Sequence, residues 1–393
     1  MLVEIGIVSG ISYTAYMIYH KDYLKYKKTF DEAIERMPFL KNNKDEKINL
    51  TTYKTKDYGY KIRFTLPVGV TTEKLTENIL AIKEAFELSS IHIINDNRFI
   101  TMHGIKLYNF KQYEPVKLPP NKILIAEFIG NNIIVDMNKF PHALICGDTG
   151  TGKSRILFII LTNLIYNSRK VDLYLLQVRK NDLAIFKSCS QVKSCSRTLE
   201  EVLEALQVID KELMRREELL DIEKGYLNIE EYNLKSGQYL KYTYVVIEEF
   251  SFLNISRVDS KSEKAMKAEC LKIIKSIVNV GRSSGVFLLT SLQKPTSDSI
   301  PTDIKAQLTT RIALNIKDKP TCSVVMGDYS AVGLADREIV CKTRDIEKGY
   351  SLTIDFPEIK EYTKKSIIEK PVKKEASTKV KNSAIDIMKA LGI

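Results

Sequence analysis

One octapeptide constrains this chain of 393 residues more than any other feature. Residues 147–154 read Gly-Asp-Thr-Gly-Thr-Gly-Lys-Ser, after the apolar run 143–146 and before a long apolar segment. Gly-x-x-x-x-Gly-Lys-Ser between a strand and a helix is the pattern of a phosphate-binding P-loop. Its glycines let backbone N–H groups curl around phosphates, and the next helix adds the positive end of its dipole. The sequence therefore predicts an α/β domain that binds a nucleotide.

Each position of this loop has a predicted task. Lys153 should reach the β- and γ-phosphates of ATP, and Ser154 should hold Mg²⁺. The backbone of the rest of the loop should surround the phosphates. The predicted ATP-binding residues are Gly147, Asp148, Thr149, Gly150, Thr151, Gly152, Lys153 and Ser154.

A second motif follows about a hundred residues later. The apolar run 244–247 ends in two carboxylates, Glu248 and Glu249. Behind a P-loop, such a strand indicates a Walker B element, in which the first acid holds the Mg²⁺ shell and the second activates the attacking water. The first position is usually Asp, and the extra methylene of Glu248 moves its carboxylate outward, which puts the metal geometry in question.

The chain around these motifs alternates between apolar strand-like runs and helical patterns. Such alternation is typical of a parallel sheet covered by helices. Thr198 and Glu201 have the spacing of a capping box at the start of a long helix predicted over 199–223. The predicted strands of this motor domain, residues 121–363, are 143–146, 171–178, 244–247, 286–290 and 311–316.

A smaller α+β module is predicted ahead of the motor, over residues 48–120. Residues 60–66 alternate like a strand, and a helix should begin at Thr72 with residues 75, 79, 82 and 86 on its apolar face. Residues 91–95 and 99–107 again have strand character. Prolines at 115, 119 and 120 mark the predicted boundary.

Both ends of the chain are less determined. Residues 1–20 are mostly apolar but short for a span and contain Glu4, so they fit either a membrane anchor or an amphipathic helix. Residues 21–47 read as a charged helix and a polar loop. The tail, residues 364–393, is Lys-rich and should be a flexible linker with a short terminal helix.

Charge and cysteine content narrow the class of protein. The net charge of +11 favours a polyanionic partner such as nucleic acid, although a Lys-rich solvated surface would give the same number. The 6 cysteines lack the spacing of a zinc site, and the chain is too large for a small disulfide-rich scaffold. Reduced thiols in a cytosolic compartment are the expectation.

Six further segments occur in the order found in one family. They are Pro141-His142; Glu212-Leu-Met-Arg215-Arg216; residues 228–233; residues 245–250; Gly281-Arg-Ser-Ser-Gly285 with Ser291-Leu-Gln293-Lys-Pro295; and Lys305 through residues 310–312. Together with the P-loop, they make residues 143–318 resemble the motor domain of the FtsK/SpoIIIE family of DNA translocases.

The resemblance implies a fold and further site residues. The fold would be a RecA-like P-loop motor that assembles as a homo-hexameric ring. Gln293 would sense the γ-phosphate, and Arg282 would be an arginine finger offered to the ATP of the neighbouring subunit, with Arg311 as a rival. Intrahelical pairs with glutamates account for Arg215 and Arg216, and we expect His142 to have a packing role.

The resemblance also implies partners. A compact layout, with one P-loop and no room for a C-terminal winged helix, resembles the FtsK-like coupling proteins of Gram-positive conjugative elements. DNA would be the transported polymer, a relaxase and channel proteins would be partners, and the location would be the cytoplasmic face of the cell membrane. Two alternatives stay open: a motor for protein secretion, and a nucleotide switch that does not hydrolyse ATP.

Overall fold

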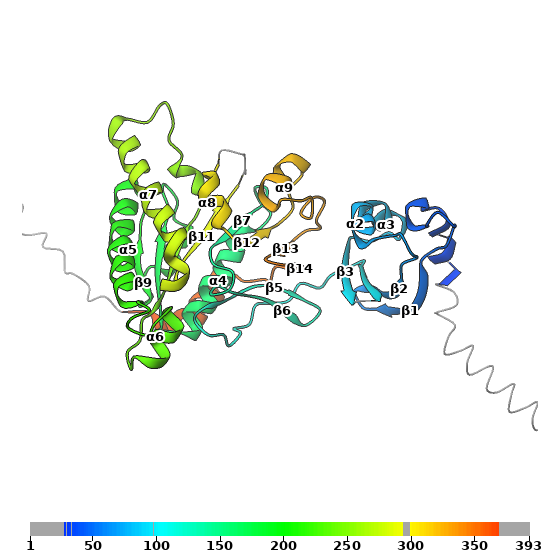
Figure 1. Ribbon diagram of the computed structural model, residues 1–393, viewed down its shortest axis with the longest axis horizontal. Coiled ribbons are helices and arrows are strands. Elements are labelled where there is room, and N and C mark those ends of the chain that lie inside the picture. The colour runs from blue at the N-terminus through cyan, green and yellow to red at the C-terminus, as the bar shows by residue number, and fades with distance from the viewer. Residues whose placement is uncertain (1–26, 29, 33, 97, 294–298, 369–393) are drawn as a thin grey trace, which may run out of the picture.

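The computed structural model describes residues 27–368, except 29, 33, 97 and 294–298. Figure 1 shows a small N-terminal module beside a larger α/β motor. Among the described residues, no helix combines the length and the apolar character needed to cross a membrane. Residues 2–19, where an anchor or an amphipathic helix was predicted, and most of the tail lie outside the described part.

The module is an antiparallel sheet with helices on one face. The strand order is β1-β2-β4-β3, and a core around Ile62 and Phe64 also takes in Phe30 and Ile34 from the segment predicted as a separate charged helix. The single helix predicted from Thr72 is broken at Asn78. The elements are η1 (Pro38–Leu40), β1 (Asn49–Lys56), β2 (Gly59–Thr65), α2 (Thr72–Glu77), α3 (Ile79–Ala85), β3 (Ser90–Asp96) and β4 (Phe99–Ile105).

The motor is built on one ten-stranded sheet with the order β6-β5-β14-β13-β12-β7-β11-β10-β8-β9. The six strands from β12 to β9 are parallel, as the alternation predicted, whereas β13, β14, β5 and β6 extend the sheet antiparallel. The strands are β5 (Lys122–Phe128), β6 (Asn131–Asp136), β7 (Ala143–Cys146), β8 (Val171–Leu176), β9 (Val192–Cys195), β10 (Tyr242–Ile247), β11 (Val286–Leu292), β12 (Thr310–Ala313), β13 (Glu338–Lys342) and β14 (Ile346–Tyr350).

Helices cover both faces of this sheet, and the apolar side chains form one core on each face. The P-loop helix α4 packs in one core, and α5 and α7 pack in the other. The helices are α4 (Lys153–Asn167), η2 (Asp182–Phe186), α5 (Leu199–Leu219), α6 (Ile229–Lys235), η3 (Phe250–Leu253), α7 (Lys261–Ser284), α8 (Thr302–Gln307), α9 (Lys319–Met326), α10 (Phe356–Thr363) and η4 (Lys364–Ser366).

Local capping explains where the two long helices begin. The Thr198 side chain accepts the backbone N–H of Glu201, as the predicted cap requires, but Glu201 bonds to the N–H of Arg197 instead of closing the box. Helix α5 ends at Leu219, four residues earlier than predicted. Ser260 and Glu263 form a full capping box at the start of α7.

Two boundary segments lie on the motor. Tyr113 is fully buried in the motor core, and its backbone N–H donates to Thr353, so the chain joins the motor several residues before the predicted boundary at 120. At the other end, the N–H of Ser190 donates to the carbonyl of Ser366 and that of Ile368 donates to Ser188. Residues 366–368, part of the segment predicted as a flexible tail, are therefore bound to the loop that precedes the edge strand β9.

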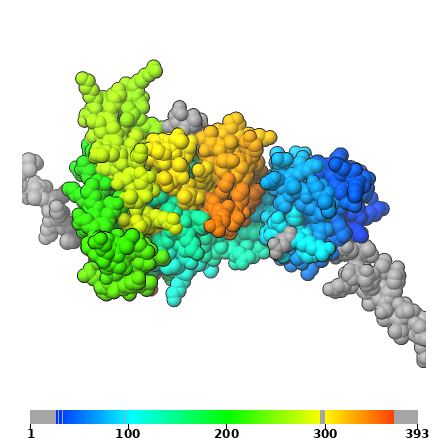
Figure 2. Space-filling model, in the orientation of Figure 1, coloured from blue at the N-terminus to red at the C-terminus, as the bar shows by residue number. Residues whose placement is uncertain are grey.

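Module and motor meet at a polar seam. The Glu338 carboxylate is buried there, 3.2 Å from His92 Nε2, and also accepts the Ser90 hydroxyl. His92 stacks on Phe128 with ring centroids 4.1 Å apart. Figure 2 shows the blue-to-cyan module lying against the gold and orange segment that contains Glu338. A buried carboxylate that loses its partners is strongly destabilising. The contacts of Glu338 with His92 and Ser90 should therefore hold the module and the motor together.

Candidate nucleotide-binding site

The P-loop connects β7 to α4 at the carboxyl edge of the sheet. Gly147, Gly150 and Gly152 have φ values of 151°, 84° and 107°, which favour glycine. A Cβ on Gly147 would lie 2.9 Å from Thr151 Oγ1 and 3.0 Å from Leu314 Cβ. The glycines are therefore needed for the backbone path, and Gly147 is also needed for the close approach of Leu314, which directly follows β12.

Lys153 lies in the bend of this loop. Its side chain is buried, and Nζ donates to the carbonyls of Gly147 at 2.6 Å and Asp148 at 2.9 Å. Burial lowers the pKa of Lys153, and the nearby Glu249 carboxylate works in the opposite direction. An ammonium held only by two backbone carbonyls has strong affinity for an anion, so phosphate oxygens fit this position well.

The strand order brings the other predicted residues to the same edge. Strand β11 lies between β7 and β10, so Gln293, which directly follows β11, falls between the P-loop and the two glutamates that follow β10. Because the strands are parallel, all these residues emerge on one side. The electrostatic effect of Glu249 on Lys153 agrees with this proximity.

Glu248 is almost fully buried, and one of its carboxylate oxygens, Oε2, is buried without a hydrogen-bond partner among the described residues. Its other oxygen lies 3.8 Å from Lys180 Nζ. Burial raises the pKa of Glu248 to about 7, with Lys180 opposing and the Asp182 and Glu249 carboxylates adding to the rise. An incoming cation would relieve both the desolvation and the carboxylate repulsion.

Glu249 has the left-handed backbone conformation, with φ 72°. Its N–H lies 3.3 Å from Ser291 Oγ on β11, and its Oε1 accepts the Ser251 hydroxyl at 2.8 Å. The second oxygen, Oε2, is buried without a hydrogen-bond partner among the described residues. Non-glycine residues in this conformation are uncommon and cluster at functional sites. The geometry leaves one carboxylate oxygen for a water molecule.

Several neighbours were missed by reasoning from the sequence. Lys180 and Asp182 follow β8 and reach Glu248, Ser291 holds Glu249, and Asn315 accepts the N–H of Asp148 at 3.2 Å through its carbonyl. The rule that carboxyl ends of parallel strands converge would have pointed to Lys180 and Asp182. Their contacts with Glu248 depend on β8 lying next to β10, which the sequence does not state.

These residues fit a nucleotide and a divalent cation. The loop has glycines where the backbone must wrap, a buried ammonium, and two buried carboxylate oxygens that lack partners among the described residues. Ser154 lies in the first turn of α4, directly after Lys153. Hard cations prefer such oxygen ligands. Although Glu248 is longer than the usual Asp, it still lies at the carboxyl edge of the sheet, where the P-loop lies.

The predicted arginine finger lies elsewhere. Arg282 is exposed in the last turn of α7, at the amino end of β11, and its Nε donates to the carbonyl of Asn138 at 2.9 Å. This is the sheet edge opposite the P-loop, so Arg282 cannot serve the nucleotide of its own chain. Arg311 donates to the carbonyl of Val325 at 2.7 Å. The role in trans stays a prediction.

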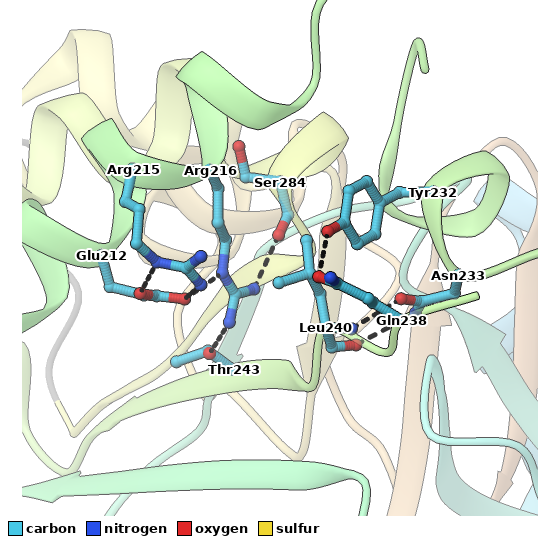
Figure 3. Close-up of polar contacts among 9 residues, drawn as sticks. All are labelled: Glu212, Arg215, Arg216, Tyr232, Asn233, Gln238, Leu240, Thr243 and Ser284. Carbon is cyan, nitrogen blue, oxygen red and sulfur yellow. Dashed lines mark hydrogen bonds and ion pairs between the residues drawn. The ribbon is translucent and has the colours of Figure 1, made fainter. Parts of the chain in front are cut away.

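The helix end that carries Arg282 is fastened by another arginine, shown in Figure 3. Arg216 is buried on α5 and donates to Glu212 at 2.8 Å, to the carbonyl of Ser284 at 2.8 Å and to Thr243 Oγ1 at 3.2 Å. The exposed Arg215 shares Glu212. Intrahelical pairing therefore accounts for Arg215, but Arg216 connects α5 to α7 and β10.

His142 has a packing role in the described structure. It is fully buried with φ 61°, and its Nδ1 accepts the backbone N–H of Leu288 at 3.0 Å. Burial lowers its pKa to about 4. The neutral ring accepts a backbone hydrogen bond from β11 and so helps to position the strand that precedes Gln293.

Comparison with known proteins agrees with this geometry. The model of the FtsK/SpoIIIE family matches residues 114–324, just over half of the chain. The chain belongs to the FtsK/SpoIIIE family. This membership confirms the resemblance inferred from the ordered motifs and identifies the motor as a P-loop ATPase domain of that family.

The curated relatives of this FtsK/SpoIIIE protein are much longer. DNA translocase SftA of Bacillus subtilis is 29% identical over 231 residues, which cover 56% of this chain and 23% of that protein. DNA translocase FtsK of Chlorobaculum tepidum is 28% identical over 211 residues, covering 50% and 25%. The match therefore spans about a quarter of these relatives.

Solved structures extend the likeness in fold. The monomer form of the pCW3 conjugation coupling protein TcpA has a TM-score of 0.62 at 20% identity, covering 86% of this chain and 99% of that one. The cytoplasmic domain of the type VII secretion ATPase EccC of Thermomonospora curvata has a TM-score of 0.52 at 19% identity, covering 67% and 32%. At these identities, the likeness shows the fold alone.

Proposed function

We propose that this FtsK/SpoIIIE protein hydrolyses ATP in a homo-hexameric ring and uses the energy to translocate DNA. The observation that carries the proposal is the convergence at one sheet edge of the P-loop, Gln293 and Glu249 in a family whose curated members include DNA translocases. The non-hydrolysing switch is less favoured because Glu249 retains an unpartnered carboxylate oxygen beside the P-loop.

In the proposed reaction, Lys153 leaves its two backbone carbonyls and binds the β- and γ-phosphates. Glu249 orients a water through Oε2 and takes its proton as the water oxygen attacks the γ-phosphorus and the bond to ADP breaks. Gln293 contacts the γ-phosphate and reports its loss. Ser154 and Glu248 would hold Mg²⁺, which neutralises charge on the phosphate oxygens.

The neighbouring subunit would complete the site. Arg282 lies at the sheet edge opposite the P-loop, so a head-to-tail ring would let it reach the ATP of the next protomer. A finger of this kind stabilises charge on the transferring phosphoryl group. Head-to-tail interfaces between identical subunits generate a closed ring when the rotation between neighbours closes. Such a ring is the assembly that a trans role of Arg282 requires.

DNA would be moved by loops at the nucleotide-bearing edge. Lys317 is exposed in the segment that connects β12 to α9, and Lys319 is exposed at the start of α9. Leu314, which directly follows β12 at the beginning of this segment, packs against Gly147. Lysines in such a position would contact phosphates without reading sequence. A change in the P-loop would reach them through β12.

We assign the transport to conjugation. The fold likeness to the conjugation coupling protein TcpA, which covers 86% of this chain and 99% of that one, supports this assignment. The protein would act at the cytoplasmic face of the cell membrane, deliver DNA bound to a relaxase, and feed it to a membrane channel. The proposal of these partners rests on this likeness in fold.

The deciding experiment is the ATPase rate as a function of added double-stranded DNA at two salt concentrations, with Glu249→Gln as the blank. Stimulation that weakens with salt and is absent from the blank is the expected result, because phosphate contacts release counterions. A flat response would refute the DNA motor.

The alternative is a motor for protein secretion, which the fold likeness to the secretion ATPase EccC supports at lower coverage. It predicts turnover that responds to a secreted protein substrate and not to DNA. The same assay, with DNA and with a candidate helical secretion substrate, distinguishes the two.

A further inference from the structure

The sheet of the small module has a second face that the module itself leaves open. Ile62 and Phe64 on β2 point into the module core, so strand alternation turns Lys61 and Arg63 to the opposite face. One end of that face docks on the motor at His92. Beside this seam His103 is also buried, whereas Lys54, Lys56 and Lys61 are exposed.

A line of basic side chains crosses this open face. The register pairs Lys54 with Lys61, Lys61 with His103, and His103 with His92. Partners in register on one face lie about 5 Å apart, so the line runs from the free edge of β1 to the seam with the motor. Lys56, two residues after Lys54, lies on the same face.

The positive charge of the three lysines on this face is not compensated. Lys54 directly opposes Lys61, an arrangement that costs stability. No carboxylate of the described residues forms an ion pair with Lys54, Lys56 or Lys61, whereas Arg63 lies 3.4 Å from Asp96.

The pKa of the neighbouring His103 is affected by this charge. Burial lowers the pKa of His103 to about 4, and the positive charges of Lys61 and Lys56 contribute to the lowering. The open face therefore has a positive potential, which attracts anions.

Protection of a sheet edge does not account for the arrangement. Lysines on an edge strand discourage pairing with other chains, and β1 is an edge strand with Lys54 and Lys56. Lys61, however, lies on β2, which is paired on both sides. A lysine there protects no edge and adds to the like-charge cost.

The aromatic rings of this face indicate which part of a nucleic acid would fit. Arg63 covers Phe99, with its guanidinium 4.1 Å from the ring centroid. His92 and His103 contact Phe128, which belongs to strand β5 of the motor. Since these rings are already occupied, unpaired bases would find no stacking platform here. Phosphates can still bind the lysines and the free edge of the guanidinium.

We propose that Lys54, Lys56, Lys61 and Arg63 form a second DNA contact on the module, separate from the nucleotide-bearing edge of the motor, that binds the phosphate backbone of double-stranded DNA. The inference rests on the proposed function for the identity of the polymer. It adds a sequence-neutral surface that holds the duplex beside the motor.

The test uses the full chain and two triple variants. Lys54→Gln, Lys56→Gln and Lys61→Gln are combined in the first. The control combines Lys28→Gln, Lys44→Gln and Lys74→Gln, three exposed lysines of the same module without ion pairs among the described residues. Fluorescence anisotropy follows binding to a duplex of about 30 base pairs between about 50 and 200 mM salt.

Loss of up to three phosphate contacts should lower the slope of log affinity against log salt by about 2–3 and weaken binding about tenfold or more at the lower salt. The control should behave as wild type. Equal affinity and slope in wild type and the first variant would overturn this inference alone.

Two further outcomes have defined meanings. A wild-type protein that does not bind duplex would overturn the proposed function as well. A first variant that aggregates while its soluble fraction binds as wild type would leave edge protection as the role of the lysines and overturn the inference.

Discussion

Two adjacent arginines on α5 offer a matched test of how the motor is held together. Arg215 and Arg216 both bind Glu212, but the side chain of Arg215 is 51% exposed and that of Arg216 is 3% exposed. Arg216 alone reaches the carbonyl of Ser284 and the hydroxyl of Thr243. Replacement by Met keeps an unbranched stem and removes the charged donors.

The expected cost follows from these contacts. A hydrogen bond to a charged group contributes about 1.5–3 kcal/mol, and breaking a fully buried ion pair costs about 3–5 kcal/mol. Glu212 is 32% exposed and keeps Arg215, so its charge is not stranded. Arg216→Met should therefore destabilise the motor by about 2–4 kcal/mol. Arg215→Met breaks a surface pair and should cost less than about 1 kcal/mol.

Urea unfolding of the full chain measures the difference, with the midpoint and slope fitted for each variant. At roughly 2–4 °C per kcal/mol for a domain of this size, Arg216→Met should also lower Tm by about 4–16 °C. If the two variants were equally mild, the buried contacts of Arg216 would contribute little, and the description of it as a fastening between α5, α7 and β10 would be wrong.

Four further predictions concern the site and the sheet. Lys153→Ala should abolish nucleotide binding in a fluorescent-nucleotide titration while circular dichroism stays unchanged; retained affinity would remove the P-loop assignment. Glu249→Gln should still bind ATP but slow phosphate release by at least about 10²-fold; an unchanged rate would show that another group activates the water. Arg282→Ala should bind ATP without turnover, and subunits mixed with Lys153→Ala should regain some activity; the absence of recovery at every mixing ratio would deprive the trans role of its support. The pKa of His142 falls from 6.5 to about 4 on folding. The free energy of unfolding should therefore be highest above pH 6.5 and decrease as the pH falls toward 4, by up to about 1.4 kcal/mol per pH unit. His142→Asn should flatten this pH dependence in urea unfolding at several pH values, and an unaltered slope would assign it to other groups.

The sequence predicted the site better than its surroundings. The P-loop and the two glutamates are local patterns, and the parallel order of strands brings them together as expected. Lys180 was missed because its contact with Glu248 depends on which strand lies beside β10. The position of Arg282 at the opposite edge could have been foreseen, since a residue that precedes a parallel strand lies at its amino end.

The errors in the fold have similar causes. Residues 72–86 have a helical pattern throughout, yet the helix is broken at Asn78. Tyr113 was assigned to the module because prolines follow it, whereas its burial in the motor is decided by tertiary packing. Residues 364–366 are polar, but backbone hydrogen bonds attach them to the motor.

The contacts also connect the nucleotide edge to the module. The N–H of Leu314 donates to Cys146 at 2.9 Å beneath the P-loop, and that of Ile316 donates to Ala331 at 3.0 Å. Beyond Ala331, the carbonyl of Gly333 accepts Lys83 of the module at 3.2 Å. A displacement of β12 caused by phosphate binding would thus act on the loop that carries this module contact. Since the open basic face lies on the same module, the proposed DNA contact there would change in step with the state of the nucleotide.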